Sequence, residues 1–310
     1  VNKLEPERVV VVASAEAQNV RAAVQPHPIA VQTEQRGTGH AVLQAKQHMA
    51  SFNGDVLILF GGDPLITPKT MRRLLDRRRG DDDPAVVVLG FRPREPGLYG
   101  RLVVNGAGRL EAIVEARDAT PEQLATDLCN SGVMAVDSKR LFDILERVGN
   151  DNAKGEFYLT DMIAIANGDG ANCAVIEARD PDELTGIDTR SDLAAAEAIV
   201  QKRLRQSAMA NGATLAAPET VFFSHDTVLG RDVIVGPNVV FAPNVKIGNN
   251  VTILPFCHLE GATVADGVTI GPFARLRPGA VIGDQVNIGN FVEIKNATLG
   301  IGAKVNHLTY

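Results

Sequence analysis

The stretch VIVGPN-VVFAPN-VKIGNN-VTILPF-CHL, residues 233–259, places an aliphatic or similarly apolar residue at every sixth position. The rhythm continues to the end of the chain and is interrupted only by a five-residue step at 259–264 and another at 294–299. An α-helix has a period of 3.6 residues and a strand a period of two, so a period of six excludes both. Three such hexads close one triangular coil of a hexapeptide-repeat parallel β-helix, in which each inward side chain stacks on its counterpart in the next coil.

Length and composition predict a two-domain protein with small-molecule rather than nucleic-acid partners. A length of 310 residues corresponds to about two domains, and a net charge of −6 offers no basic face for phosphate backbones. No apolar run reaches ~18 residues, so no membrane partner is expected. Cys129, Cys173 and Cys257 lack CxxC spacing and cannot form an even disulfide framework, which indicates a reducing, cytoplasmic location.

Residues 1–190 have the pattern of an α/β domain. Short continuous apolar runs, typical of strands covered on both faces, occur at Val9–Ala13, Val56–Phe60 and Ala85–Gly90. Helical stretches separate them, at Glu16–Val24, His40–Ala50 and Pro68–Arg79. This alternation predicts a doubly wound, largely parallel sheet with ligands at the carboxyl ends of its strands. Residues 191–211 are rich in Ala, Leu and Arg and predict a linker helix before the β-helix of residues 212–310.

Both ends of the sequence lie close to predicted structure. Val1 is only a few residues from the first predicted strand, and the six-residue repeat is still running at His307–Tyr310 without a polar cap. An open terminal coil of a solenoid exposes its stacking surface, so natural solenoids are capped. We therefore expect both domains to be incomplete in this sequence.

Polar motifs follow the predicted strands. Gln32–His40 ends in Gly-Thr-Gly and leads into a helix, where glycines and free backbone N–H groups suit a phosphate or a nucleobase, although a plain turn fits as well. Gly61-Gly62-Asp63 follows a buried strand, the usual place for a Mg²⁺ ligand beside a nucleotide, although Asp63 could also merely begin a turn.

The order of the motifs resembles one family, the bifunctional GlmU enzymes that make UDP-N-acetylglucosamine. The motifs are QTEQRGTGHA (32–41), GGDPLI (61–66), YGRL (99–102), IVEARDAT (113–120), NSG (130–132), GEFYLTD (155–161), GIDTR (186–190), FARLRPG (273–279), IGNFVEIKN (288–296) and HLTY (307–310). The resemblance covers nearly the whole chain. It implies a Rossmann-like uridylyltransferase domain, then an N-acetyltransferase domain on a left-handed parallel β-helix, and assembly as a homotrimer.

The resemblance assigns the first site to UTP and N-acetylglucosamine-1-phosphate. Its implied binding residues are Gln32, Gly37 and Thr38 for uracil, Gly100, Glu115 and Asn130 for the sugar phosphate, and Gly61, Gly62 and Asp188 beside them. The resemblance also implies that Asp63 and Asp188 are the ligands of a Mg²⁺ ion. Two departures occur here: the carboxylate of Asp63 lies one residue later than in the family's Gly-Asp-x-Pro motif, and Asp188 replaces an asparagine. One residue reverses side-chain direction on an extended strand, so we expect Asp63 to need a local change to reach the metal.

The family's Gly-rich loop, with the Arg and Lys that hold the triphosphate, would lie before Val1. Uridylyl transfer depends mainly on positioning and charge neutralisation. We therefore expect the chain as it stands to lack this activity.

The second implied site lies on the β-helix and takes glucosamine-1-phosphate and acetyl-CoA. Arg277 and Lys295 are eighteen residues apart, one full coil, so we expect them to stack on one face and to suit a phosphate, although a solvated charged pair is the plainer alternative. The resemblance makes His307 the general base, for which a histidine has a suitable pKa, and makes Tyr310 a substrate contact. It places the acetyl-CoA contacts in later coils and in a neighbouring subunit.

Two other functions remain open at this stage. The chain could be another sugar-1-phosphate nucleotidylyltransferase with a regulatory β-helix, against which HLTY and the Arg277/Lys295 pair argue. It could also be a non-catalytic assembly subunit that keeps the fold, for which the displaced Asp63 is the support.

Overall fold

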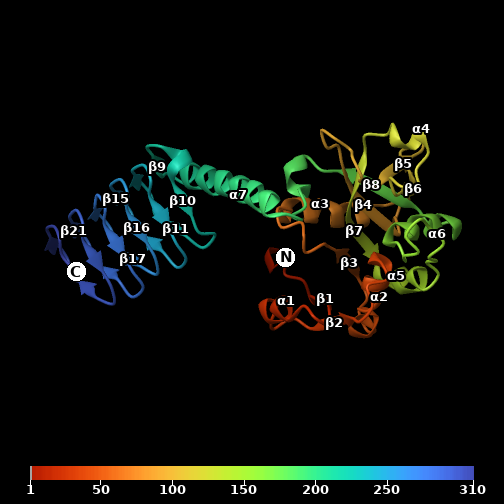
Figure 1. The fold of residues 1–310 in the computed structure, drawn as a ribbon, viewed down its shortest axis with the longest axis horizontal. Helices are drawn as coiled ribbons and strands as arrows, with labels where there is room; N and C mark the ends of the chain where they lie inside the picture. Colours follow the sequence, from red (N-terminus) through yellow and green to blue (C-terminus); the bar gives the residue numbers. More distant parts are fainter. Residues whose placement is uncertain (1) are drawn as a thin grey trace. The chain divides into compact units, whose positions relative to one another are not determined.

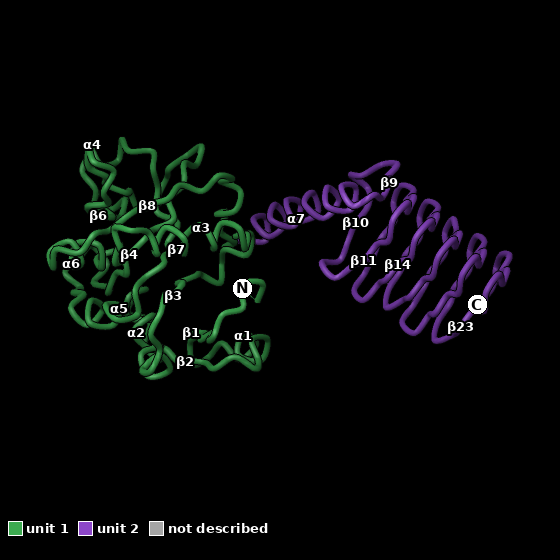
Figure 2. The backbone as a smooth tube through the Cα atoms, turned by 180° about the vertical axis from the view of Figure 1, so that it is seen from behind, with its two compact units in different colours: residues 1–188 green, residues 189–310 purple. Residues whose placement is uncertain are grey.

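The computed structural model describes residues 2–310; Val1, the first residue of the predicted first domain, lies outside the described residues. The chain forms two compact units, Val1–Asp188 and Thr189–Tyr310 (Figure 2). No helix in the described part of the chain is both long enough and apolar enough to cross a membrane.

The first unit is built on a six-stranded mixed sheet (Figure 1). Its strands are β3 (Asp55–Ile58), β4 (Val86–Phe91), β5 (Arg101–Val104), β6 (Leu110–Val114), β7 (Cys129–Asp137) and β8 (Cys173–Glu177). Their order is β6-β5-β7-β4-β8, with β3 also paired to β7. The prediction of a largely parallel sheet is wrong, because β7 lies between β3 and β4 and runs antiparallel to both, whereas β4 and β8 are parallel.

The central strands are covered on both faces, as their apolar sequences predicted. Val86 and Val88 of β4 belong to a core that includes Leu141 and Ile163, whereas Val87 and Leu89 pack with Leu74 on the opposite face. Alternate side chains of a strand point to opposite faces, so six consecutive buried residues need a layer on each side. The sheet is therefore the middle of three layers. Figure 1 shows the helix at residues 68–78 on one side and the helices at 138–145 and 162–168 on the other.

The first predicted strand does not belong to this sheet. β1 (Val11–Ser14) pairs in parallel with β2 (Ile29–Gln32) as a separate two-stranded sheet, and three of its four residues are only partly buried. The apolar run at Val9–Ala13 therefore predicted the strand correctly. The prediction that this strand is covered on both faces is wrong.

The helices of the first unit are short. They are α1 (Gln18–Ala23), α2 (Thr38–Leu43), α3 (Pro68–Arg78), α4 (Pro121–Leu124), α5 (Ser138–Leu145) and α6 (Met162–Gly168). The predicted helix His40–Ala50 is divided, because α2 ends at Leu43 and a 3₁₀ turn follows at Lys46–Met49. Helix α3 starts where predicted: Thr67 caps it by accepting a hydrogen bond from the Thr70 N–H, and Pro68 occupies the first helical position.

The second unit is a parallel β-helix, as the six-residue repeat predicted. Sixteen two-residue strands form three parallel sheets, β10-β13-β16-β19-β22, β11-β14-β17-β20-β23 and β24-β21-β18-β15-β12-β9. The strands are β9 (Thr214–Leu215), β10 (Phe222–Phe223), β11 (Val228–Leu229), β12 (Ile234–Val235), β13 (Val240–Phe241), β14 (Lys246–Ile247), β15 (Thr252–Ile253), β16 (His258–Leu259), β17 (Thr263–Val264), β18 (Thr269–Ile270), β19 (Arg275–Leu276), β20 (Val281–Ile282), β21 (Asn287–Ile288), β22 (Glu293–Ile294), β23 (Thr298–Leu299) and β24 (Lys304–Val305).

Each inward aliphatic residue stacks on its copy one coil away. Val235 pairs with Ile253 eighteen residues later, and Ile253 pairs with Ile270 seventeen residues later because the coil contains one five-residue step. All three side chains are buried. The coils begin earlier than the repeat indicated, at Thr214, because the first coil is irregular and spaces Leu215 and Phe223 eight residues apart.

The corners of the β-helix are left-handed turns that form three columns. One column contains Asn244, Gly261, Gly279 and Asn296, and a second contains Asp232, Asn250, Gly267, Gln285 and Gly302. The third contains Asn238, Phe256, Phe273, Phe291 and Leu308, all with φ between 49° and 62°. Gly and Asn tolerate this conformation, whereas bulky apolar residues rarely adopt it.

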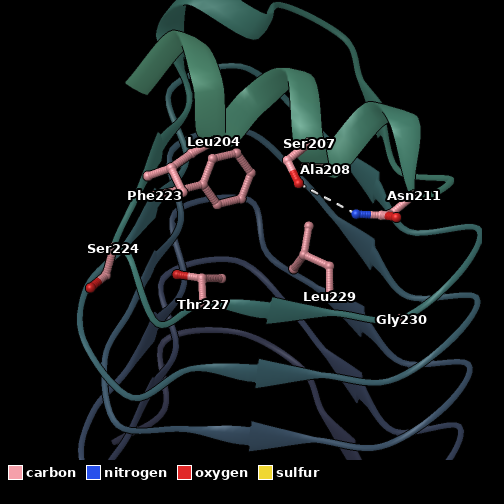
Figure 3. A pocket seen from close by; sticks show the side chains of 9 residues that line it. All are labelled: Leu204, Ser207, Ala208, Asn211, Phe223, Ser224, Thr227, Leu229 and Gly230. Atoms are coloured by element: carbon pink, nitrogen blue, oxygen red, sulfur yellow. Dashed lines mark hydrogen bonds between the residues drawn. The ribbon is translucent and has the colours of Figure 1, made fainter. Parts of the chain in front are cut away.

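Helix α7 (Arg190–Ala210) covers the first coil. Thr189 and Asp192 form a capping box at its start. The side-chain amide of Gln201 donates to the Phe223 carbonyl at 2.7 Å and accepts from the Phe223 N–H at 2.9 Å, so it pairs with β10 as another strand would. Leu204 and Ala208 pack on the coil core, and Figure 3 shows them above Phe223 beside a small cavity of about 110 Å³.

Candidate functional site

The loop that follows β2 carries the predicted uracil-binding residues. Gln32, the last residue of β2, donates from its amide nitrogen to the Gly37 carbonyl at 3.2 Å and approaches Nδ1 of His40 at 3.0 Å. These contacts orient the Gln32 amide within the loop. An amide oriented in this way offers both a donor and an acceptor edge, which is what recognition of a nucleobase requires.

This loop is held against the segment 155–161. Gly37 has φ of 112°, and a Cβ there would lie 2.6 Å from the Phe157 carbonyl oxygen, so the close approach requires glycine. The Phe157 N–H donates to the Arg36 carbonyl at 2.8 Å, and the Leu159 N–H donates to the Thr38 hydroxyl at 3.0 Å. The Arg36 guanidinium lies 4.9 Å from the centre of the Phe157 ring.

The next residue of the same segment reaches the predicted sugar-binding residues. Thr160 donates from its hydroxyl to Glu115 at 3.3 Å. Gly100 and Asn130 are also neighbours, because the Asn130 N–H donates to the Gly100 carbonyl at 2.8 Å. Leu159 and Thr160 therefore connect the uracil loop to the residues that follow β6, and the structure brings these two predicted groups into one region.

This region is partly buried and acidic. Burial raises the pKa of Glu115, with the Thr160 hydrogen bond and the Lys154 charge opposing the shift. Burial also raises the pKa of Asp161, and the charge of Asp118 adds to that shift. A carboxylate in such a setting gains from accepting hydrogen bonds, so Glu115 is suited to bind the hydroxyl or amide donors of a sugar.

The predicted metal ligands come from two segments that run side by side. The Ile187 N–H donates to the Gly62 carbonyl at 2.9 Å, and a Cβ on Gly186 would lie 3.4 Å from the Asp63 carboxylate. Burial and the charge of Asp188 together raise the pKa of Asp63. Gly61 has open space around it.

Asp63 lies at the end of a turn that follows β3. Strand β3 ends at Ile58, and the Asp63 N–H donates to the Phe60 carbonyl at 3.2 Å. The predicted strand Val56–Phe60 therefore ends two residues early, and the alternation argument does not apply to Asp63 because a turn separates it from the strand. The Phe60 ring packs where a Cβ of Gly132 would lie, so this turn adjoins the strand that carries Asn130.

On the β-helix, the register places Arg277 and Lys295 one coil apart, as their spacing predicted. Leu276 pairs with Ile294, and the Arg277 N–H donates to the Ile294 carbonyl at 2.8 Å. The Arg277 side chain also binds Glu293, with Nη1 donating to Oε1 at 2.8 Å. Arg275 approaches the other Glu293 oxygen at 3.5 Å.

His307 and Tyr310 lie at the corner that leads into this face. The Glu293 N–H donates to the Thr309 carbonyl at 2.8 Å, so residues 307–310 run beside residues 290–293 of the preceding coil. Thr309 and Tyr310 line a cavity of about 370 Å³ together with Phe273, Phe291 and Arg275. Both His307 and Tyr310 are exposed to solvent.

Thr160 and Glu293 are among the residues that touch predicted site residues but were not predicted as site residues themselves. Thr160 binds Glu115, and Glu293 holds Arg277 while also lying near Arg275. The signal for Glu293 was available, because it precedes Lys295 by two residues and so points from the same face of the coil. Thr160 could not be paired with Glu115 from spacing, since forty-five residues separate them.

An α/β domain with a nucleotide-type loop, followed by a hexapeptide β-helix, defines a two-domain transferase. Residues 1–126 match the MobA-like NTP transferase domain, and residues 226–261 and 261–296 match the bacterial transferase hexapeptide repeat.

The chain is also similar to proteins named bifunctional protein GlmU. It is 58% identical to that of Paramagnetospirillum magneticum, over all of this chain and 69% of the relative, and 62% identical to that of Rhodospirillum rubrum, over 98% and 68%. The relative from Sphingopyxis alaskensis is 53% identical, over all of this chain and 68% of its own length. The chain belongs to the GlmU family, so the predicted pairing of uridylyltransferase and acetyltransferase in UDP-N-acetylglucosamine synthesis is confirmed.

Proposed function

We propose that the first unit binds UTP and N-acetylglucosamine-1-phosphate through the residues placed above. Gln32, Gly37 and Thr38 contact uracil, while Gly100, Glu115 and Asn130 contact the sugar phosphate, with Gly61, Gly62 and Asp188 lining the space between. A phosphate oxygen of the sugar attacks the α-phosphorus of UTP, and the bond to the β-phosphate breaks to release pyrophosphate. The observation that carries this proposal is the contact of consecutive residues, Leu159 with Thr38 and Thr160 with Glu115, which brings a base site and a sugar site together.

Asp63 and Asp188 are the proposed Mg²⁺ ligands. Their carboxylates are close enough for one charge to raise the pKa of the other, and two hard oxygen donors fit Mg²⁺ with substrate phosphates completing its shell. When bound, Mg²⁺ would neutralise charge on the triphosphate. The chain's own carboxylates would fix its position, and the turn at Phe60–Asp63 sets their approach.

The second unit is the proposed acetyltransferase, with glucosamine-1-phosphate held by Arg277, Lys295 and Tyr310. His307 accepts a proton as the sugar amine attacks the thioester carbon of acetyl-CoA. The carbon–sulfur bond then breaks, and the coenzyme leaves as a thiol after taking up the proton. Glu293 orients Arg277 beside this phosphate site.

We further propose a cytoplasmic homotrimer, with residues 1–190 as the uridylyltransferase domain, 191–211 as the linker helix and 212–310 as the acetyltransferase domain. The two compact units and the parallel β-helix support this division.

Two substrate assays test the proposal in the protein as its gene encodes it. Pyrophosphate release should require Mg²⁺, UTP and N-acetylglucosamine-1-phosphate, and thiol release from acetyl-CoA should require glucosamine-1-phosphate. Equal pyrophosphate release from ATP and glucose-1-phosphate, without acetyl transfer, would instead identify a nucleotidylyltransferase with a regulatory β-helix. Absence of both activities would identify an assembly subunit.

A further inference from the structure

The ring of Phe157 contacts two residues that flank the Gly37-Thr38 pair of the proposed uracil site. The Arg36 guanidinium carbon lies 4.9 Å from the centre of this ring. The His40 ring lies 6.3 Å from it, centre to centre, and is tilted by 36°. Arg36 comes directly before the pair and His40 follows it by two residues, so one aromatic ring has a neighbour at each end of the segment that is proposed to contact the base.

The backbone of Phe157 holds the same segment independently of the ring. Its N–H donates to the Arg36 carbonyl at 2.8 Å, and its carbonyl accepts from the Gly39 N–H at 2.8 Å. A Cβ on Gly39 would lie 3.0 Å from that carbonyl oxygen, so the two segments are in close contact. A substitution that changes only the ring leaves both hydrogen bonds possible, and its effect therefore reports what the ring itself contributes.

His40 connects the ring to the side chain that is proposed to recognise uracil. Its Nδ1 lies 3.0 Å from the amide nitrogen of Gln32, and its Nε2 lies 3.2 Å from the amide nitrogen of Gln44. The imidazole thus meets an amide at each nitrogen and the Phe157 ring as a further neighbour. The position of the imidazole determines which way the Gln32 amide is oriented.

The contact between Arg36 and Phe157 is too weak to hold the fold but strong enough to influence the position of the loop. Arg36 is exposed, whereas Phe157 is partly buried against the core of the first unit. A cation over an aromatic ring at an exposed site changes an equilibrium by roughly two- to fivefold. An effect of this size is expected in substrate recognition rather than in folding.

We propose that Phe157, held by Arg36, is a positioning residue for uracil recognition. The ring sets the imidazole of His40, and His40 in turn orients the Gln32 amide toward the base. The inference rests on the uridylyltransferase function proposed above and names residues that set its selectivity for the base. Uracil presents an N–H donor and a carbonyl acceptor, where cytosine presents an acceptor nitrogen and an amino donor. A Gln32 amide that can turn over would accept either base, because its oxygen and its nitrogen would exchange places.

The test compares UTP with CTP in the protein as its gene encodes it, using pyrophosphate release. Arg36→Met and Phe157→Leu should each raise the KM for UTP by about threefold and lower the preference for UTP over CTP by a similar factor. The kcat and the KM for N-acetylglucosamine-1-phosphate should not change. The double variant should be no worse than Phe157→Leu alone, because Arg36 acts through the ring.

Two further variants serve as controls. Arg36→Lys keeps a cation beside the ring and should retain the wild-type KM and preference. Arg72→Met removes an exposed arginine from helix α3 and should also leave both unchanged. Because Arg36 is exposed, Arg36→Met tests the inference even if Phe157→Leu does not fold.

Two results would overturn the positioning role. Additive effects in the double variant would show that Arg36 acts on the nucleotide directly, and a raised KM with an unchanged preference for UTP would reduce the ring to a structural role. The wild-type protein separates these outcomes from a failure of the proposed function. If it releases no pyrophosphate from UTP and N-acetylglucosamine-1-phosphate in Mg²⁺, the uridylyltransferase assignment fails; if it is active and Arg36→Met is indistinguishable from it, only the positioning role fails.

Discussion

The two proposed sites are built in opposite ways. In the first unit, residues from positions 32 to 188 meet through loops, and single hydrogen bonds such as Leu159 to Thr38 connect distant segments. In the second unit, Arg277 and Lys295 lie at equivalent positions of consecutive coils because the register of the strands repeats. The first arrangement depends on many separate contacts, whereas the second depends on one repeated register.

This difference determines how far a local change should spread. A substitution on the surface of the β-helix that carries Arg277 and Lys295 removes one side chain. The register of the strands in the neighbouring coils is unchanged. A substitution in the first unit alters a loop whose position is set by few hydrogen bonds.

In the protein as its gene encodes it, His307→Ala should remove acetyl transfer and leave uridylyl transfer intact. Loss of a general base costs about 10²–10⁴-fold in rate. His307 belongs to the second compact unit, whereas the proposed uridylyltransferase residues belong to the first. Thiol release from acetyl-CoA and pyrophosphate release from UTP measure the two activities on one preparation. Retained acetyl transfer would show that His307 is not the base, and loss of both activities in a folded protein would contradict the separation of the sites.

Asp63→Asn should have the reverse effect. We expect uridylyl transfer to fall on the order of 100-fold, because a metal ligand supports several kcal/mol of transition-state charge stabilisation, while acetyl transfer is unchanged. The pKa of Asp63 is raised by burial and by Asp188, so its ionised form costs stability at neutral pH. The variant should therefore unfold at the same temperature as the wild-type protein or at a higher one.

The exposed carboxylate of Asp151 provides the matched control within the same unit. Asp151→Asn should change neither the Mg²⁺ dependence nor the melting temperature. A Mg²⁺ titration that gives the same half-saturation for Asp63→Asn and the wild-type protein would remove Asp63 from the metal site.

The contrast between a site built from loops and a site built from a repeated register also explains what could be predicted from the sequence. Periodicity predicted the β-helix, its buried residues and the equivalent positions of Arg277 and Lys295 in consecutive coils, because the register there recurs at fixed spacing. It could not predict that β7 would insert antiparallel between β3 and β4, since that pairing joins residues about eighty positions apart. Nor could alternation locate Asp63, because the strand ends at Ile58 and a turn follows.

Gln201→Leu should destabilise the start of the β-helix. The substitution leaves the N–H and the carbonyl of Phe223 without the amide that now pairs with both, and unsatisfied buried groups cost about 1–3 kcal/mol. The exposed residue Gln206 on the same helix is the control, as Gln206→Leu removes a glutamine without removing that pairing. Thermal unfolding followed by circular dichroism should show a lower midpoint for Gln201→Leu alone; equal midpoints would mean that the amide does not stabilise the first coil.

The smallest effect concerns two buried thiols, one in each unit, which can report whether the units unfold separately. Burial raises the pKa of Cys173 in the first unit and of Cys257 in the second to about 11. An unfolded cysteine ionises near pH 8.5. Each thiol therefore contributes stability that is complete below about pH 8.5 and is lost as the pH rises toward about 11.

At pH 8 the native protein should leave both thiols unlabelled by an alkylating reagent, because the thiolate is the reactive form and access is blocked. In increasing urea, mass spectrometry should detect labelling of Cys173 and Cys257 at different concentrations, since a loop-connected α/β unit and a register-based β-helix have independent cores. Simultaneous labelling at every urea concentration would show instead that the two units unfold as one cooperative structure.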